Sequence, residues 1–140
     1  MRSLILRKVA QSILPVTTLF ALYLLLRGHN EPGGGFIAGL VTSAAIVLQA
    51  LAFGAERTRR RLDPLVRPFA WVGVGTSVAA GLLAVARGEP FLKHYHTYLA
   101  VPGRDPVHLS TALVFDVGVY LVVVGATTMM LAVFAEEAEE

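Results

Sequence analysis

The chain has 140 residues, of which 55% are hydrophobic, and its mean hydropathy is +0.64. It contains no cysteine, which excludes a disulfide framework and a thiolate metal site. The pI near 9.3 would suit a nucleic-acid partner. The basic residues lie between apolar runs, however, where lipid headgroups and membrane topology explain them better. We therefore predict that the chain binds no nucleic acid.

Four long apolar runs follow one another along the chain, at 9–26, 35–55, 68–86 and 110–135. Each has the ~20-residue length that a helix needs to cross the core of a bilayer. The sequence therefore predicts an all-α integral membrane protein with four transmembrane helices in a single membrane domain, residues 1–140. The predicted connections are a cytoplasmic loop at 56–67 and outer loops at 27–34 and 87–109.

The first run follows Arg2, Arg7 and Lys8, as the apolar part of a signal peptide would. It is longer than the ~7–15 residues of such a region, and Arg27-Gly28-His29 is not a small-residue cleavage site. We therefore expect this run to be retained as the first membrane helix.

The stretch between the first two runs reads Gly28-His-Asn-Glu-Pro-Gly-Gly-Gly-Phe-Ile-Ala-Gly-Leu40. Pro32 restricts its own backbone and that of the residue before it, whereas Gly33, Gly34 and Gly35 open conformations that other residues avoid. We expect a sharp reversal that presents polar side chains and lets another backbone come close. A phosphate-binding loop is a weak alternative, because the lysine and Ser/Thr of a P-loop are missing and no strand precedes it.

Small residues recur every four positions in two of the runs: Gly35, Gly39 and Ser43 in the second, and Gly73, Ser77 and Gly81 in the third. In the fourth run, Gly118 and Gly125 are seven apart and share a face. In lipid, such stripes let helices approach closely where little hydrophobic force joins them. We therefore predict that these faces are helix contacts.

The basic residues predict the orientation. With the N-terminus inside, eight basic residues fall on the cytoplasmic side (Arg2, Arg7, Lys8, Arg57, Arg59, Arg60, Arg61 and Arg67) and four on the other side (Arg27, Arg87, Lys93 and Arg104). The positive-inside rule therefore favours both termini in the cytoplasm.

One carboxylate, Asp116, lies inside the fourth run. At the centre of a membrane helix such a group costs ~2.5–3.5 kcal/mol, so it is a functional hypothesis by default. Asp116 is about two turns from the outer end, roughly 9 Å deep, which lowers that cost. Two alternatives stay open: a part of an ion or proton path, or a structural partner for a cation or backbone donor near the outer face.

All four histidines, His29, His94, His96 and His108, fall on the predicted outer side. Together with Glu31 they are ligand types that zinc accepts. Their spacing matches no recognised metal motif, so we predict neither a metal nor a cofactor.

The stretch from Gly28 to Leu40, joined with Thr111-Ala-Leu-Val-Phe-Asp-Val-Gly-Val-Tyr-Leu-Val-Val-Val-Gly125, resembles the B subunit (MrpB/MnhB family) of the Mrp (also Mnh) multisubunit sodium/proton antiporters. The resemblance covers nearly the whole chain, including the Gly88-Glu-Pro-Phe91 sequence. It implies an accessory component, not an enzyme, of a seven-subunit complex in prokaryotic plasma membranes that exchanges Na⁺ for H⁺. The implied partners are the A, C, D, E, F and G subunits and the membrane lipids, with the proton channels in the large antiporter-like subunits.

On this resemblance we expect roles for a short set of residues, none of them catalytic. Asp116 would anchor the start of the fourth helix or border an outer ion vestibule. The others would shape the turn or pack helices: His29, Glu31 and Pro32 in the outer turn, Gly33, Gly34, Gly35 and Gly39 in tight contacts, and Phe36 against a partner helix.

Three alternatives compete with the antiporter component. The resemblance also allows the same domain in a membrane-bound hydrogenase-type complex. A self-sufficient transporter of four spans, working as a homo-dimer, would place an essential carboxylate deep in a helix. A membrane enzyme that uses the outer histidines would need a nucleophile or metal constellation that the sequence lacks. One embedded carboxylate, with no embedded lysine or histidine, is too little for a complete relay, so the accessory role is favoured.

Overall fold

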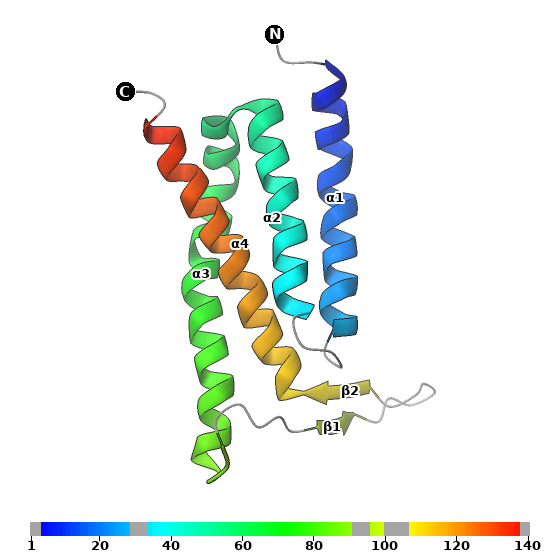
Figure 1. Cartoon of the computed structure of the whole chain (residues 1–140), viewed down its shortest axis with the longest axis vertical. Coiled ribbons are helices and arrows are strands. Elements are labelled where there is room, and N and C mark those ends of the chain that lie inside the picture. Colours follow the sequence, from blue (N-terminus) through cyan, green and yellow to red (C-terminus); the bar gives the residue numbers. More distant parts are fainter. Residues whose placement is uncertain (1–3, 29–33, 91–95, 100–106, 138–140) are drawn as a thin grey trace.

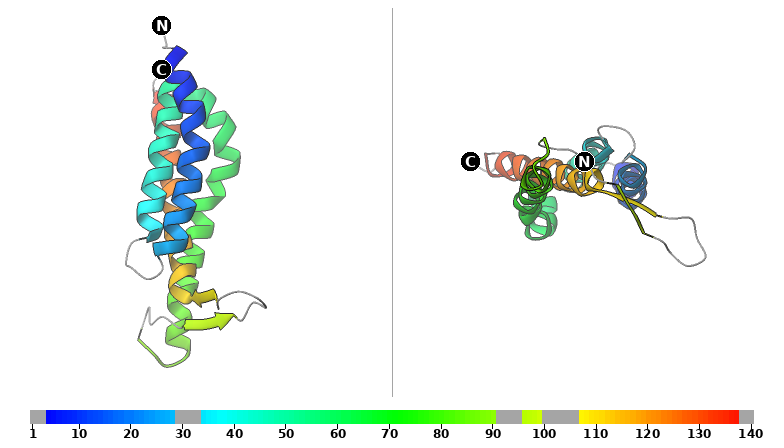
Figure 2. Two further views of the ribbon diagram at one scale, coloured as in Figure 1. Left: turned by 90° about the vertical axis from the view of Figure 1, so that its right-hand side faces the viewer. Right: turned by 90° about the horizontal axis from the view of Figure 1, so that it is seen from below.

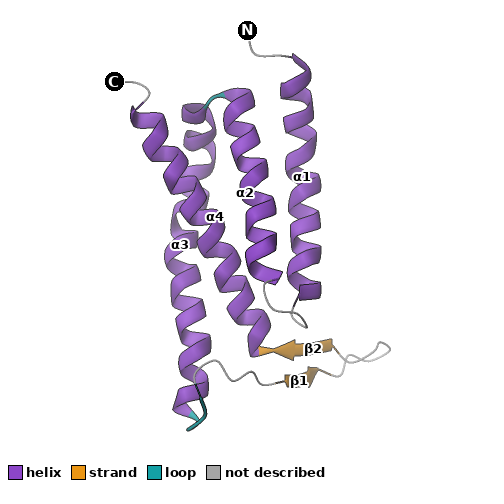
Figure 3. Ribbon diagram, in the orientation of Figure 1, coloured by secondary structure: helices purple, strands orange, loops and turns teal. Residues whose placement is uncertain are grey.

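The computed structural model describes residues 4–28, 34–90, 96–99 and 107–137, with the backbone alone at 96–99, 107–110 and 136–137. Figures 1 and 3 show long helices and a small sheet. In chain order the elements are α1 (Leu4–Arg27), α2 (Gly34–Phe53), α3 (Ala55–Ala86), β1 (His96–Leu99), β2 (Val107–Ser110) and α4 (Thr111–Glu137).

All four helices are long and apolar enough to cross a membrane, which confirms the predicted fold class. The strands were not predicted. β1 and β2 pair antiparallel, with His96 opposite Ser110 and Leu99 opposite Val107, within the segment that the sequence assigned to an outer loop. This hairpin leads directly into α4, which begins at Thr111.

The helices lie side by side, but α4 crosses α3, so their order in Figure 1 changes along the bundle. It is α1, α2, α4, α3 at the lower end and α1, α2, α3, α4 at the upper end, where α2 also packs against α3. In Figure 1, α4 runs obliquely across α3, and it also packs against α2. On its other side α2 packs against α1, and the view from below in Figure 2 shows the same spread arrangement. The start of α1 and the end of α4 lie at the same end of the bundle.

The structure corrects the predicted loop at 56–67, because α3 already begins at Ala55. Gly54 makes the whole reversal from α2 to α3. Its φ of 100° lies in the region that favours glycine. Its N–H donates to the carbonyl of Ala50 (2.9 Å), and its own carbonyl accepts from the N–H of Thr58 (3.1 Å). A single residue therefore replaces the twelve-residue connection that we expected.

The basic start of α3 is helical because its charges pair along the helix. Arg60 bonds to Glu56 and Arg67 to Asp63, the latter at 2.9 Å, and pairs four apart stabilise a helix. Pro64 and Pro68 both lie inside α3, so neither proline marks its start. At 32 residues the helix is about 48 Å long, which exceeds the ~30 Å hydrocarbon core. Its first turns can therefore lie outside the apolar layer.

The other end of α3 closes with a glycine cap at Gly88, whose φ is 76°. The N–H of Gly88 donates to Val85 (2.9 Å), and that of Glu89 donates to Ala84 (3.1 Å). This pair of bonds is the Schellman motif, which satisfies the last carbonyls of a helix.

Helices α3 and α4 contact each other backbone to backbone. A Cβ added at Gly73 would lie 2.6 Å from the carbonyl oxygen of Gly118 and 2.7 Å from the nitrogen of Val122. A Cβ at Gly118 would overlap the hydroxyl of Ser77, and one at Gly125 would lie 2.6 Å from the nitrogen of Ala70. The small-residue faces predicted around Gly73 and Gly118 are therefore confirmed as helix contacts.

Large apolar side chains lie on the outside of the bundle instead. Among the most exposed are Leu4, Ile5, Leu19, Trp71 and Phe134. The buried apolar residues are mostly alanines, and no large side chain of the described part is fully buried. The chain therefore presents an apolar surface to lipid or to other membrane proteins.

We expect Gly73→Ala to lower the free energy of unfolding of the purified chain by ~1–3 kcal/mol, because the added methyl meets the backbone of α4. Gly75→Ala is the matched control: a Cβ there meets nothing within 4 Å, and alanine favours a helix over glycine. Thermal unfolding in detergent compares the two variants. Equal melting temperatures would contradict the close contact.

Candidate functional site

The first turn of α2 rests on the backbone of α4 at Asp116. A Cβ at Gly35 would overlap the carbonyl oxygen of Asp116 and lie 2.8 Å from its Cα. One turn further on, a Cβ at Gly39 would lie 2.8 Å from Cβ of Val123 and 3.4 Å from the carbonyl oxygen of Tyr120. The absence of side chains at these two positions therefore sets the spacing between α2 and α4.

The end of α1 and the start of α2 also contact each other. A Cβ at Gly34 would lie 2.6 Å from Cα of Gly28. The residues between these glycines, 29–33, lie outside the described part, so the roles expected for His29, Glu31, Pro32 and Gly33 stay predictions. Phe36 follows the buried Gly34 and Gly35 and is half exposed, and its contact with a partner helix likewise stays a prediction.

Asp116 is half-buried on α4 and interacts with another group of the chain. It is the only Asp, Glu, Lys, Arg or His within 9–26, 34–53, 68–86 and 111–135. The described residues hold no group of three His, Cys, Asp or Glu that would bind a metal. The four histidine side chains lie outside that part. The apolar spans thus hold one carboxylate, on a residue whose main chain supports α2.

One turn along α4 from Asp116, a hydroxyl pair joins α4 to α2. The hydroxyls of Thr42 and Tyr120 are 3.2 Å apart, which is a hydrogen bond that either can donate. The Tyr120 ring packs against two apolar clusters of the bundle: Ala21, Leu25 and Ala38, and Ile46, Val66 and Val124. Sequence reasoning did not select this pair. The only indication of this pair in the sequence is that both hydroxyl residues lie within apolar runs.

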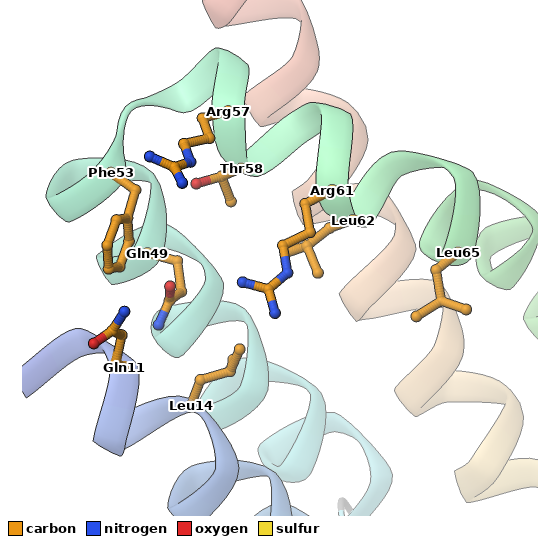
Figure 4. Close-up of a pocket in the computed structure, with 9 residues that line it drawn as sticks. All are labelled: Gln11, Leu14, Gln49, Phe53, Arg57, Thr58, Arg61, Leu62 and Leu65. Atoms are coloured by element: carbon orange, nitrogen blue, oxygen red, sulfur yellow. The ribbon is translucent and has the colours of Figure 1, made fainter. Parts of the chain in front are cut away.

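A pocket of about 330 Å³ lies at the other end of the bundle, between α1, α2 and α3 (Figure 4). Polar groups line it from all three helices: Gln11, Gln49, Thr58, Arg57 and Arg61. Sequence reasoning missed this pocket because it assigned 56–67 to a loop. The register that turns two arginines toward α1 and α2 exists only once α3 begins at Ala55.

The neighbouring charges on α3 pair with each other. Glu56 bonds to Arg60 and lies 3.7 Å from Arg59. The hydrogen bond from Arg60, together with the positive charges of Arg59 and Arg60, holds the pKa of Glu56 below its ordinary value. Because its pKa is lowered, Glu56 is ionised at neutral pH. It lies in the first turn of α3, before the apolar part of that helix.

Known proteins resemble this chain along nearly its whole length. Residues 5–129 match the family model described as "Domain related to MnhB subunit of Na+/H+ antiporter". The B subunit of the Na(+)/H(+) antiporter of Bacillus subtilis (strain 168) is 40% identical over 96% of this chain and 94% of its own. The A/B subunit of the probable K(+)/H(+) antiporter of Rhizobium meliloti (strain 1021) is 37% identical over 88% of this chain, which is 12% of that longer protein.

A solved structure shares the fold. It is a chain of the Mrp complex from Dietzia sp. DQ12-45-1b, with a TM-score of 0.71 and 38% identity over 92% of this chain. The matched region is 13% of the Dietzia chain, so the fold found here also occurs as one part of a much longer polypeptide.

We expect Gly35→Ala to separate α2 from α4 and to lower the unfolding free energy by ~1–3 kcal/mol, because the methyl meets the main chain of Asp116. The adjacent variant Phe36→Ala should leave the stability of the isolated chain nearly unchanged, since Phe36 is half exposed. Thermal unfolding of both purified variants is the measurement. A Gly35→Ala protein as stable as Phe36→Ala would show that α2 does not rest on α4 there.

Proposed function

This chain belongs to the family of MnhB-related subunits of Na+/H+ antiporters, and on that premise we propose that it acts as the B subunit of a multisubunit cation/proton antiporter in a prokaryotic plasma membrane. It is a multi-pass membrane protein and a component of a transporter rather than an enzyme. Its role in the complex is accessory: it positions larger subunits and does not itself carry ions across the membrane.

The observation that carries this proposal is the distribution of ionisable groups. A proton or cation relay through a membrane needs several ionisable side chains in succession. The four apolar spans hold only Asp116, near one end of α4. The rest of a path would have to come from other subunits.

For Asp116 we favour the structural alternative. Its main chain forms the surface on which Gly35 rests, and the Thr42–Tyr120 bond lies one turn away. Both features tie α2 to the start of α4. Asp116 then anchors this end of the bundle, whereas an ion path along it would need a second group at the same depth.

Large subunits are the proposed partners, and the A subunit is the first of them. The relative from Rhizobium is designated A/B and is about eight times longer than the matched region. A polypeptide that unites the two keeps the B part beside the A part, which supports direct contact where A and B are separate proteins. The exposed apolar faces of α1 and α3 offer the surface for such contacts and for those with the C to G subunits and lipids.

The orientation is part of the proposal. The start of α1, the α2–α3 reversal and the end of α4 lie at one end of the bundle (Figure 1). Arg7, Lys8 and the arginines at the start of α3 belong to that end. By the positive-inside rule we place this end in the cytoplasm.

We expect a gentle detergent pull-down of the tagged chain from its native membrane to recover several large antiporter-like membrane proteins, identified by mass spectrometry. Phe36→Ala should recover fewer of them if Phe36 packs against a partner helix. Recovery of hydrogenase subunits would assign the chain to a different complex. A lone chain or a dimer would refute the accessory role.

We expect Asp116→Asn to assemble normally and to keep antiport within about twofold of the wild type, because asparagine preserves the shape of an anchoring side chain while removing its charge. Cation-dependent dissipation of a pH gradient in inverted vesicles measures antiport, and subunit recovery measures assembly. Normal assembly with antiport lost would instead place Asp116 on an ion path.

A further inference from the structure

Two arginines of the pocket between α1, α2 and α3 lack the ion pairs that neighbouring arginines of α3 form within the described part of the chain. Arg57 and Arg61 are one turn apart and extend toward α1 and α2 (Figure 4). Within the described part of the chain, neither forms an ion pair or a side-chain hydrogen bond, whereas Arg59 and Arg60 pair with Glu56. Two positive charges thus face one pocket without a negative partner from the described residues.

The remaining walls of the pocket are partly polar and partly apolar. Gln49 is buried, and its amide donates to the carbonyl of Ala10, which ties α2 to α1 and fixes this wall. Leu14, Leu62 and Leu65 supply an apolar flank. A volume of about 330 Å³ lies in the range of small-ligand pockets. The pocket therefore suits a molecule with an anionic head and an apolar body.

Charged residues on α1 indicate the depth of the pocket in the membrane. Lys8 and Arg27 are 19 residues apart, about 28 Å along a helix, which matches the ~30 Å hydrocarbon core. Gln11 lies only about 4.5 Å along the axis from Lys8, and Leu14 lies one turn deeper. The arginines thus lie near the headgroup level, and the leucines extend toward the hydrocarbon.

We propose that this pocket binds an anionic phospholipid, with Arg57 and Arg61 contacting the headgroup phosphate and Leu14 and Leu65 flanking an acyl chain. Guanidinium groups form paired hydrogen bonds with phosphate oxygens, and basic pockets between transmembrane helices bind anionic headgroups. The apolar flank favours a lipid over a free phosphate ion or an acidic protein segment. The bound lipid bridges α1 and the start of α3 across α2.

The test uses the purified antiporter complex that contains this chain, with short-chain phosphatidylglycerol as the probe. We expect R57Q/R61Q to bind it about 30-fold more weakly than the wild type and to retain less native lipid in mass spectrometry. The matched control is R59Q/R60Q, which removes the same charge from the same helix but no residue of the pocket. We expect it to bind like the wild type.

Soluble glycerol phosphate and short-chain phosphatidylcholine distinguish the sources of the ligand. Neither should displace phosphatidylglycerol at equal concentration. Displacement by glycerol phosphate would show that free phosphate suffices and would overturn the lipid assignment. Equal loss of binding in the two double variants would show that the lipid responds only to the surface charge of α3. This outcome would also overturn the lipid assignment.

Assembly provides the remaining outcomes. If R57Q/R61Q loses partner subunits while its lipid content is unchanged, the pocket is a contact for protein and the proposal fails. If R57Q/R61Q does not assemble, R57K/R61K keeps both charges and should assemble with weaker binding, because lysine lacks the planar pair of donors. A lysine variant that binds as tightly as the wild type would contradict the guanidinium–phosphate contact.

Discussion

The structure depends on the close approach of α4 to two other helices. Glycines make this approach possible: Gly73, Gly118 and Gly125 between α3 and α4, and Gly35 and Gly39 between α2 and α4. In a bilayer the lipid tails are as apolar as the side chains, so burial of apolar area does little to join helices. Van der Waals contact at short range does more, and only residues without large side chains allow it.

This constraint gives the bundle small residues inside and large apolar ones outside, which is the reverse of a soluble core. Alanine and glycine fill the contacts, while Leu19, Trp71 and Phe134 face outward. Such a chain is packed internally and still has apolar surface for neighbours. That surface fits an accessory role among larger subunits, and it fits the occurrence of the same fold within longer chains.

The two ends of the bundle provide different polar features. At one end, the backbone of Asp116 supports the start of α2, and a hydroxyl pair follows one turn later. At the other end, Gly54 turns α2 directly into α3, which brings Arg57 and Arg61 against α1 and α2. The first end is held by contacts within the chain. The second presents charges that the described part of the chain does not neutralise, and this asymmetry is the basis for assigning an external ligand there.

The sequence by itself determined the four membrane helices, because the thickness of the bilayer and the need to satisfy every backbone group act on each segment separately. It also identified the small-residue faces and the family, through long motifs. It did not determine where α3 begins: the charges and prolines at 56–68 suggested a loop, yet Gly54 alone reverses the chain. Only the tertiary structure placed Gly35 on Asp116, Thr42 beside Tyr120, and Arg57 and Arg61 in one pocket. Periodicity shows which face of a helix is small or polar, but the helix that this face meets is decided by the simultaneous fit of the whole bundle.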